Sequence, residues 1–425
     1  MDGWSLALIA AVIVAFAAVS RRLHDSIVSP ALFFTAAGLV LGSDALGWIE
    51  LDLGGETIRL LAEATLTLVL FADASRIDLG ALRREYSVPV RLLGIGLPLT
   101  IGLGMLLAWP LLPGLSAIEA LVLAVMLAPT DAALGKAVVS EPRLPSRIRQ
   151  GLNVESGLND GICVPLLLIA LAAAEAEETA LTARDAVTVV AEQIGYGVVG
   201  GIVAGVAGAL LLRIVVRRSL IDGTWAQILT VGLAALAYGI AAPLGGSGFI
   251  AAFVGGLLFG RLRQEAGGDV DHLLEETGEA LNSVTFIVFG SVILGVALTS
   301  ITWQTGLYAV LSLTVVRMIP VAVAMLGTRA RRPTVAFLGW FGPRGLASIV
   351  FAVIVIEEAS LPHTDAILLA TALTIGLSVL AHGVSASPLT ARYARWYEAH
   401  AEPPAMESVE TPEQRVRRHW SPRIS

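Results

Sequence analysis

Six charged side chains lie within otherwise apolar segments, and they are the residues of this chain that could do chemistry. Four are acids and two are arginines: Asp73, Asp131, Glu155, Asp160, Arg317 and Arg344. A charged side chain at the centre of a bilayer costs about 2.5–3.5 kcal/mol on insertion scales, so such residues mark function by default. Acids with internal counter-charges are the composition expected of a pathway for cations.

The run NVESGLNDG places two polar faces on one helix. Ser156 and Asp160 are four residues apart and share a face, and Glu155 and Asn159 form a second such pair. At about 100° per residue, Asp160 and Glu155 point about 140° apart and are not expected to hold the same ion. We predict that Asp160 and Ser156 face the ion, while Glu155 pairs with an arginine, because an unpaired buried carboxylate would shed its charge. A purely structural, paired Asp160 is the alternative.

Two of the apolar segments carry helix-breaking residues beside these charges. Pro129 precedes Thr130 and Asp131 in one segment, and three glycines and a proline surround Arg344 in another. Proline removes a backbone donor and glycine loosens a helix. Broken helices at corresponding places in two halves of a chain indicate a transporter binding site. The freed carbonyl of Thr130 could then coordinate a cation; a simple kink is the alternative for each cluster taken alone.

Thirteen apolar segments, each of about the 20 residues that a bilayer demands, must position these side chains. Their approximate limits are 4–20, 26–42, 58–74, 88–110, 115–136, 151–173, 187–212, 224–243, 246–260, 279–298, 304–327, 333–356 and 364–386. With 56% hydrophobic and 15% charged residues, the chain is neither a soluble enzyme nor a nucleic-acid binder. The predicted fold class is an all-α polytopic membrane protein with 13 transmembrane helices in the lipid bilayer.

The basic residues predict how the chain is oriented. Nearly all of the 28 Lys and Arg residues lie in or beside alternate loops, and the remaining loops carry acids. The positive-inside rule then puts the N-terminus outside and the C-terminus in the cytoplasm. Residues 1–386 would form the transmembrane domain of a multi-pass protein of the cytoplasmic (inner) cell membrane, and residues 387–425 a short cytoplasmic tail. Six segments, a linking seventh and six more would make two inverted repeats, with the interrupted fifth and twelfth segments in corresponding places.

At LNVESGLNDG the chain resembles the monovalent cation:proton antiporters of the NhaP/NHE type, over about residues 4–386. The motifs that carry the resemblance are APTDAALG, the ExxxND of Glu155, Asn159 and Asp160, GGSGFIAAFVGGLLFGR at 245–261, and the arginine-bearing VVRMIPV and GPRGLAS. The resemblance implies crossed broken helices, a dimerisation domain of segments 1–3 and 8–10, a core domain of segments 4–6 and 11–13, and a homodimer.

The resemblance also implies roles for the site residues. Asp160 would be the essential carboxylate, alternately protonated and cation-bound, with Asn159 as its neutral neighbour. The remaining members of the ion site would be Ser156, Thr130 and Asp131. Family members with Asn-Asp at this position are typically electroneutral.

Three further residues take their expected roles from the same resemblance. Asp73 matches a position where some family members place a glutamate near the ion. Glu155 would form a structural ion pair with an arginine. Arg317 is the first choice of partner, and Arg344 is the second.

The predicted function is secondary antiport of a monovalent cation for protons, serving pH and cation homeostasis. Na⁺ is the first choice of cation, with Li⁺ or K⁺ as alternatives, and no resident cofactor is expected. A K⁺/H⁺ antiporter of the same fold and an organic-anion transporter with arginine ligands are the competing functions. A cation channel would arrange its acids in symmetric rings. An intramembrane aspartyl protease could use Asp131 and Asp160, but it would leave the arginines unexplained.

Overall fold

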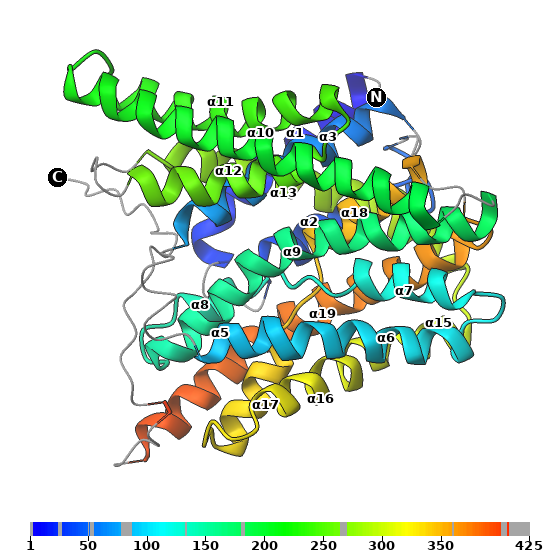
Figure 1. Cartoon of the computed structure of the whole chain (residues 1–425). Helices are drawn as coiled ribbons and strands as arrows, with labels where there is room; N and C mark the ends of the chain where they lie inside the picture. Colours follow the sequence, from blue (N-terminus) through cyan, green and yellow to red (C-terminus); the bar gives the residue numbers. More distant parts are fainter. Residues whose placement is uncertain are drawn as a thin grey trace.

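The computed structural model describes residues 3–23, 28–49, 51, 55–77, 87–131, 134–179, 183–263, 270–358, 361–400 and 406–407. Within these ranges every regular element is a helix, and the one extended pairing is an isolated bridge between Gly42 and Ile49 (Figure 1). The prediction of an all-helical fold is therefore confirmed.

Eight helical stretches in the described part of the chain are long and apolar enough to cross a membrane. They are Gly3–Leu23, Ser87–Leu111, Ser146–Glu177, Arg184–Arg217, Gly223–Leu244, His272–Thr299, Trp303–Ala324 and Thr364–Glu398. Shorter apolar helices are Pro30–Leu41, Ala117–Met126 and Leu346–Glu357. Repeated long apolar helices of this kind are typical of a multi-pass membrane protein.

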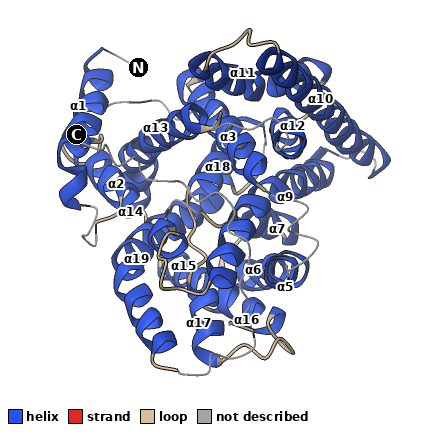
Figure 2. Cartoon of the chain, turned by 90° about the vertical axis from the view of Figure 1, so that its left-hand side faces the viewer, coloured by secondary structure: helices blue, strands red, loops and turns tan. Residues whose placement is uncertain are grey.

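One set of helices, which we name the α12 group, packs around α3 and α12. Its members are α1 (Gly3–Leu23), α2 (Pro30–Leu41), α3 (Glu56–Arg76), α10 (Ala183–Arg217), α11 (Gly223–Ala241), η2 (Ala242–Leu244), α12 (Gly248–Arg263), α13 (His272–Val288), η3 (Phe289–Leu294) and α14 (Gly295–Thr299). Helix α12 contacts α3, α10 and α11, and α13 contacts α2 and α3. In the view of Figure 2, α3 and α10–α13 fill the upper half.

The remaining helices form the α9 group. They are α5 (Ser87–Arg91), η1 (Leu92–Gly96), α6 (Leu97–Leu111), α7 (Ala117–Met126), α8 (Lys136–Val139), α9 (Ser146–Thr179), α15 (Trp303–Leu313), α16 (Val315–Ala324), α17 (Arg332–Trp340), α18 (Leu346–Glu358) and α19 (Thr364–Glu398). Figure 2 shows α9 and α18 between the rest of this group, below them, and helices α3 and α10–α13 of the α12 group above. These two helices therefore line the boundary between the groups, and α3 packs against both of them.

Glycines allow α3 and α12 to approach closely. A Cβ added at Gly256 or Gly260 would collide with the backbone of Phe71 or Ser75 on α3. Small residues serve membrane helices in this way, because close backbone approach maximises van der Waals packing. Residue 73 lies about 200° round the helix from residue 71, so Asp73 is directed away from α12. The glycine contacts thereby orient this acid toward α9.

Both predicted helix breaks are present. Helix α7 ends at Met126, and residues 128–131 have no regular structure. Helix α17 ends at Trp340 and α18 begins at Leu346, and residues 341–345 between them have no regular structure. The breaks fall where proline lacks a backbone donor and glycine lowers the cost of leaving the helix.

Other boundaries differ from the sequence prediction. Helix α19 continues to Glu398 instead of ending at 386, because its last turns have a partner: Tyr393 is buried and stacks on Phe337 with ring centroids 4.3 Å apart. The prediction that residues 387–425 form a cytoplasmic tail stays a prediction, and most of these residues, 401–405 and 408–425, lie outside the described part of the chain. Segments 88–110 and 279–298 each contain an unpredicted π-helical turn, η1 and η3.

Candidate cation-binding site

The two broken helices meet at their interruptions, where Asp131 caps the second half of the other helix. The Asp131 backbone N–H donates to Pro343 O at 2.7 Å, and Asp131 Oδ2 accepts from the Leu346 N–H at 3.0 Å. A carboxylate at a helix N-terminus satisfies an otherwise orphaned donor and opposes the helix dipole. Asp131 therefore stabilises the start of α18. A Cβ at position 345 would collide with the Asp131 carboxylate, so the close contact between the two breaks requires Gly345.

Arg344 makes the reciprocal contact at the end of α7. Its side chain is fully buried, and Nη1 donates to Ala128 O at 2.7 Å and to Pro129 O at 3.1 Å. The Ser348 hydroxyl donates to Met126 O at 2.7 Å. The carbonyls released by the break thus regain donors, and a positive charge lies at the negative end of the half-helix.

Helix α9 holds the break in α7 through Thr130. The Ser156 hydroxyl donates to the Thr130 carbonyl, and Asn159 Nδ2 donates to Thr130 Oγ1 at 2.7 Å. All three residues are buried. Asn159 is therefore more than a neutral neighbour of the acid, because it fixes the hydroxyl of the interrupted segment.

Asp160 is the acid at the centre of this arrangement. Its side chain is buried, and its Oδ1 has no hydrogen-bond partner among the described residues. Asp131 and Asp73 are its charged neighbours. Carboxylate, hydroxyl and carbonyl oxygens are thus gathered at one place, and such hard oxygen donors suit a small cation with waters completing its shell.

A small cavity reaches the place where the two broken helices cross, from the N-terminal side of α9. The residues that line it are Thr130, Asp131, Gly135, Val138, Val139, Leu152, Ser156, Phe341 and Pro343. Both predicted ligands of the interrupted α7 segment, Thr130 and Asp131, are therefore on its wall, together with Ser156 of α9.

Glu155 lies on the other face of α9 and pairs with Arg317 of α16. The two side chains are joined by two hydrogen bonds of 2.5 and 2.8 Å and are almost completely buried. A Cβ at Gly342 would collide with the Arg317 guanidinium, so the second break also makes room for this pair. Arg344, the second choice from the sequence, is engaged with α7 carbonyls instead.

Asp73 approaches the site from the α12 group. A Cβ at Gly157 of α9 would lie 3.6 Å from the Asp73 Cβ, so the two helices are in contact there. The Asp73 carboxylate also lies 3.6 Å from Arg76 Nη1 on its own helix. Its charge is therefore partly balanced within α3.

Ser378 and His382 of α19 support the second break and were not identified from the sequence. Ser378 Oγ accepts from the Arg344 backbone N–H at 2.6 Å, and His382 Nδ1 lies 3.2 Å from that hydroxyl. His382 Nε2 lies 2.9 Å from Trp340 O, the last carbonyl of α17. A proton on Nε2 lets the imidazole donate to Trp340 O, and Nδ1 also lies 3.0 Å from Ser378 O. A histidine inside the apolar segment 364–386 was the signal that could have identified this support.

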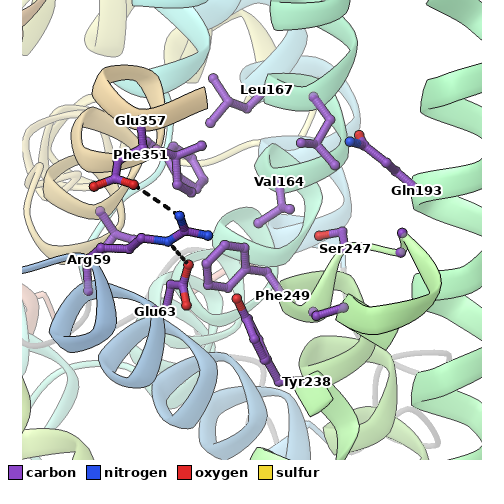
Figure 3. Close-up of a pocket in the computed structure, with 18 residues that line it drawn as sticks. Arg59, Glu63, Val164, Leu167, Gln193, Tyr238, Ser247, Phe249, Phe351 and Glu357 are labelled. Carbon is purple, nitrogen blue, oxygen red and sulfur yellow. Dashed lines mark hydrogen bonds and ion pairs between the residues drawn. The ribbon is translucent and has the colours of Figure 1, made fainter. Parts of the chain in front are cut away.

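A second cavity, of about 270 Å³, lies between the two groups on the C-terminal side of Asp160 (Figure 3). Val164, one turn beyond Asp160 on α9, forms part of its wall. Arg59 of α3 crosses it: Nε lies 2.8 Å from Glu63 on the same helix, and Nη1 lies 3.2 Å from Glu357 at the end of α18. The other labelled lining residues are Leu167, Gln193, Tyr238, Ser247, Phe249 and Phe351. The cavity therefore lies along the boundary between the groups and reaches α9 one turn beyond Asp160.

The buried pair gives a stability prediction. Glu155→Gln should destabilise the protein by about 3–5 kcal/mol, because it leaves the Arg317 charge buried without its counter-charge. The midpoint of thermal unfolding in detergent measures the loss. Glu276→Gln, the same change at an exposed position of α13, should be nearly neutral. A Glu155→Gln protein that unfolds at the parent temperature would contradict the role assigned to the pair.

A second prediction concerns the support from α19. Ser378→Ala removes the acceptor of the buried Arg344 N–H, which should cost about 1–3 kcal/mol and loosen residues 341–345. Amide hydrogen exchange of that segment should accelerate. Thr374→Ala is the matched control, since Thr374 Oγ1 donates to Ala370 O, one turn back on the same helix, and not to the break. Equal exchange in both variants would mean that Ser378 does not hold the break.

Comparison with known proteins assigns the chain to a family. A family model described as the transmembrane sodium/hydrogen exchanger matches residues 7–392. The K(+)/H(+) antiporter NhaP2 of Shewanella sp. (strain MR-4) is 27% identical over 350 residues, which are 82% of this chain and 59% of that protein. The Na(+)/H(+) antiporter NhaP of Pseudomonas aeruginosa is 27% identical over 402 residues, covering 86% of this chain and 90% of that one.

A solved structure shares the fold. The sodium proton antiporter MjNhaP1 from Methanocaldococcus jannaschii superimposes with a TM-score of 0.72 at 19% identity, over 89% of this chain and 98% of that chain. The chain spans about three-fifths of the length of the NhaP2 relatives. Because the family model covers most of the sequence, the resemblance read from its motifs is confirmed: the chain belongs to the transmembrane sodium/hydrogen exchanger family.

Proposed function

We propose that this protein is a secondary antiporter that exchanges a monovalent cation for protons at Asp160. The observation that carries the proposal is the buried Asp160 carboxylate, which has an oxygen without a hydrogen-bond partner in the described structure. Its neighbour Asn159 binds the hydroxyl of Thr130 in the interrupted segment. The names of the relatives, which include both Na(+)/H(+) and K(+)/H(+) antiporters, support the same chemistry. We favour Na⁺ as the cation, with K⁺ and Li⁺ as the alternatives.

The exchange needs only one titrating carboxylate. A proton and a cation compete for the oxygens of Asp160, so the site carries one or the other. An empty, charged carboxylate is expensive to move through a low-dielectric barrier, and only the loaded forms would cross. Coupling then follows without a gate that senses both ions.

The surroundings of Asp160 make the exchange electroneutral. Asn159 adds no charge, and Glu155 with Arg317 forms a neutral pair. One proton would therefore replace one cation. The transmembrane potential, worth about 2.3 kcal/mol per charge per 100 mV, would not drive this exchange.

We propose the full arrangement of 13 membrane-spanning segments for the chain, with the N-terminus outside and the C-terminus in the cytoplasm of the inner membrane. Each predicted segment contains helix, which supports the number of membrane-spanning segments. The alternation of basic loops supports the orientation of the two termini. The matching breaks in the fifth and twelfth segments support two inverted repeats linked by α10. A homodimer would form through the α12 group.

Alternating access would come from movement of the α9 group against the α12 group. Every hydrogen bond of the crossing described above joins residues within the α9 group, so the site can move as a unit. The cavity of Figure 3 lies along the proposed sliding surface. Arg59 and Glu357 join the two groups across it.

Transport of an organic anion is less well supported. It would require arginines available as ligands, yet Arg317 is paired with Glu155 and Arg344 is directed to the carbonyls of Ala128 and Pro129. Cation exchange uses the acids and needs the arginines only as partners.

The central prediction is that Asp160→Asn abolishes cation-driven proton flux. The assay uses proteoliposomes with an acidic interior, a pH-sensitive dye and a clamped membrane potential. Adding Na⁺, Li⁺ or K⁺ outside should collapse the pH gradient for the parent protein, and choline should not. Asp365→Asn, the same change at an exposed position of α19, should retain full exchange.

Two outcomes of this assay would count against the proposal. Flux that persists in Asp160→Asn would remove Asp160 from the mechanism. Exchange rates that follow the imposed potential would contradict the one-for-one electroneutral exchange.

Movement between the groups is tested by cross-linking Arg59→Cys to Glu357→Cys with a reducible bis-thiosulfonate spacer. A spacer is used because a direct disulfide requires Cα atoms within about 7 Å. The native cysteine, Cys163, is buried. Cross-linking should stop exchange, and reduction should restore it. The control is the Arg59→Cys/Glu63→Cys pair, which lies on one helix and should tolerate the same cross-link without loss of exchange. Full exchange with residues 59 and 357 joined would show that the two groups do not move relative to each other at this contact.

A further inference from the structure

Arg76 is a charged residue near the site to which neither the sequence nor the proposed function gives a role. It ends α3, and its guanidinium contacts two carboxylates. Nη1 lies 3.6 Å from Asp73 Oδ1, and Nη2 contacts Glu275 Oε1 of α13. The Arg76 side chain is 11% exposed, so water screens these pairs only in part.

The partner Asp73 connects Arg76 to the ion. Asp73 packs at Gly157 on α9, next to Ser156, and is one of the charged neighbours of Asp160. A cation held at Asp160 is therefore attracted by the Asp73 carboxylate as well. The strength of that attraction depends on how far Arg76 cancels the Asp73 charge, because a guanidinium remains protonated throughout the physiological range.

Glu275 competes with Asp73 for the guanidinium of Arg76. Both Glu275 and Arg76 belong to the α12 group, so their contact does not depend on the position of the α9 group. A guanidinium drawn toward Glu275 leaves more negative charge at Asp73. Without Glu275, Asp73 would be its main partner among the contacts described here.

We infer that Arg76 is a positioning residue that sets the apparent affinity for the transported cation, by competing with the cation for the carboxylate of Asp73. The inference rests on the proposed antiport at Asp160 and concerns its KM, whereas Asp160 determines whether exchange occurs at all. Arg76 and Glu275 act in opposite directions: Arg76 weakens cation binding, and Glu275 relieves that effect.

The test measures KM and kcat for the cation in proteoliposomes with single and double variants. Arg76→Gln should lower KM about threefold, the size expected for loss of a partly exposed ion pair, and Glu275→Gln should raise it by a similar factor. Arg76→Lys should lie near the parent. Asp73→Asn should raise KM, and adding Arg76→Gln to Asp73→Asn should change it no further. Changes in kcat should remain small in all of these variants, and Glu276→Gln is the control on α13.

The opposite signs separate this role from a structural one. If Arg76→Gln and Glu275→Gln shift KM in the same direction, or if the Arg76 effect persists without Asp73, the inference is wrong. Should Arg76→Gln not fold, Glu275→Gln with and without Asp73→Asn decides the question, because its KM increase must vanish when Asp73 is neutral. Flux that survives Asp160→Asn would instead overturn the proposed function.

Discussion

The structure depends on supplying hydrogen-bond partners to two helices that are broken inside a membrane. No water in the hydrocarbon can satisfy exposed backbone groups, so the protein must do so itself. The two breaks satisfy each other: Asp131 accepts from the start of α18, and Arg344 donates to the end of α7. The opposite charges also face opposite helix dipoles. Neither break would be stable without the other, and their crossing fixes where the ion site can form.

These reciprocal hydrogen bonds between the two breaks explain why so many charges lie beside Asp160, the proposed functional acid. Asp131 and Arg344 each bind backbone groups of the opposite broken helix, and Glu155 balances Arg317 on the far face of α9. What remains is Asp160, with one oxygen that no described residue satisfies. A carboxylate with an unsatisfied oxygen can hold one cation or one proton. The proposed electroneutral exchange would follow from this arrangement.

The sequence predicted the parts of the site that local geometry determines. Pro129 marked a break, and the spacing of Glu155 and Asp160 separated a structural face from a functional one. It could not predict the targets of Asp131 and Arg344, because these depend on how two segments about 200 residues apart in the chain cross. The same limit applies to the end of α19, which is set by aromatic packing on α17 rather than by hydropathy.

Two acids of the proposed ion site, Asp160 and Asp73, belong to different groups of helices, and this would have a consequence for exchange. Asp160 is tied through α9 to the break at Thr130, whereas Asp73 is held on α3 by the glycine contacts with α12. If the α9 group moves, Asp160 travels and Asp73 stays. The cation would then meet a second carboxylate at one end of the movement only, while the proton, bound to Asp160, would not require it. Asp73 and Arg76 would therefore shift the apparent affinity on one side of the membrane without altering the one-for-one exchange proposed at Asp160.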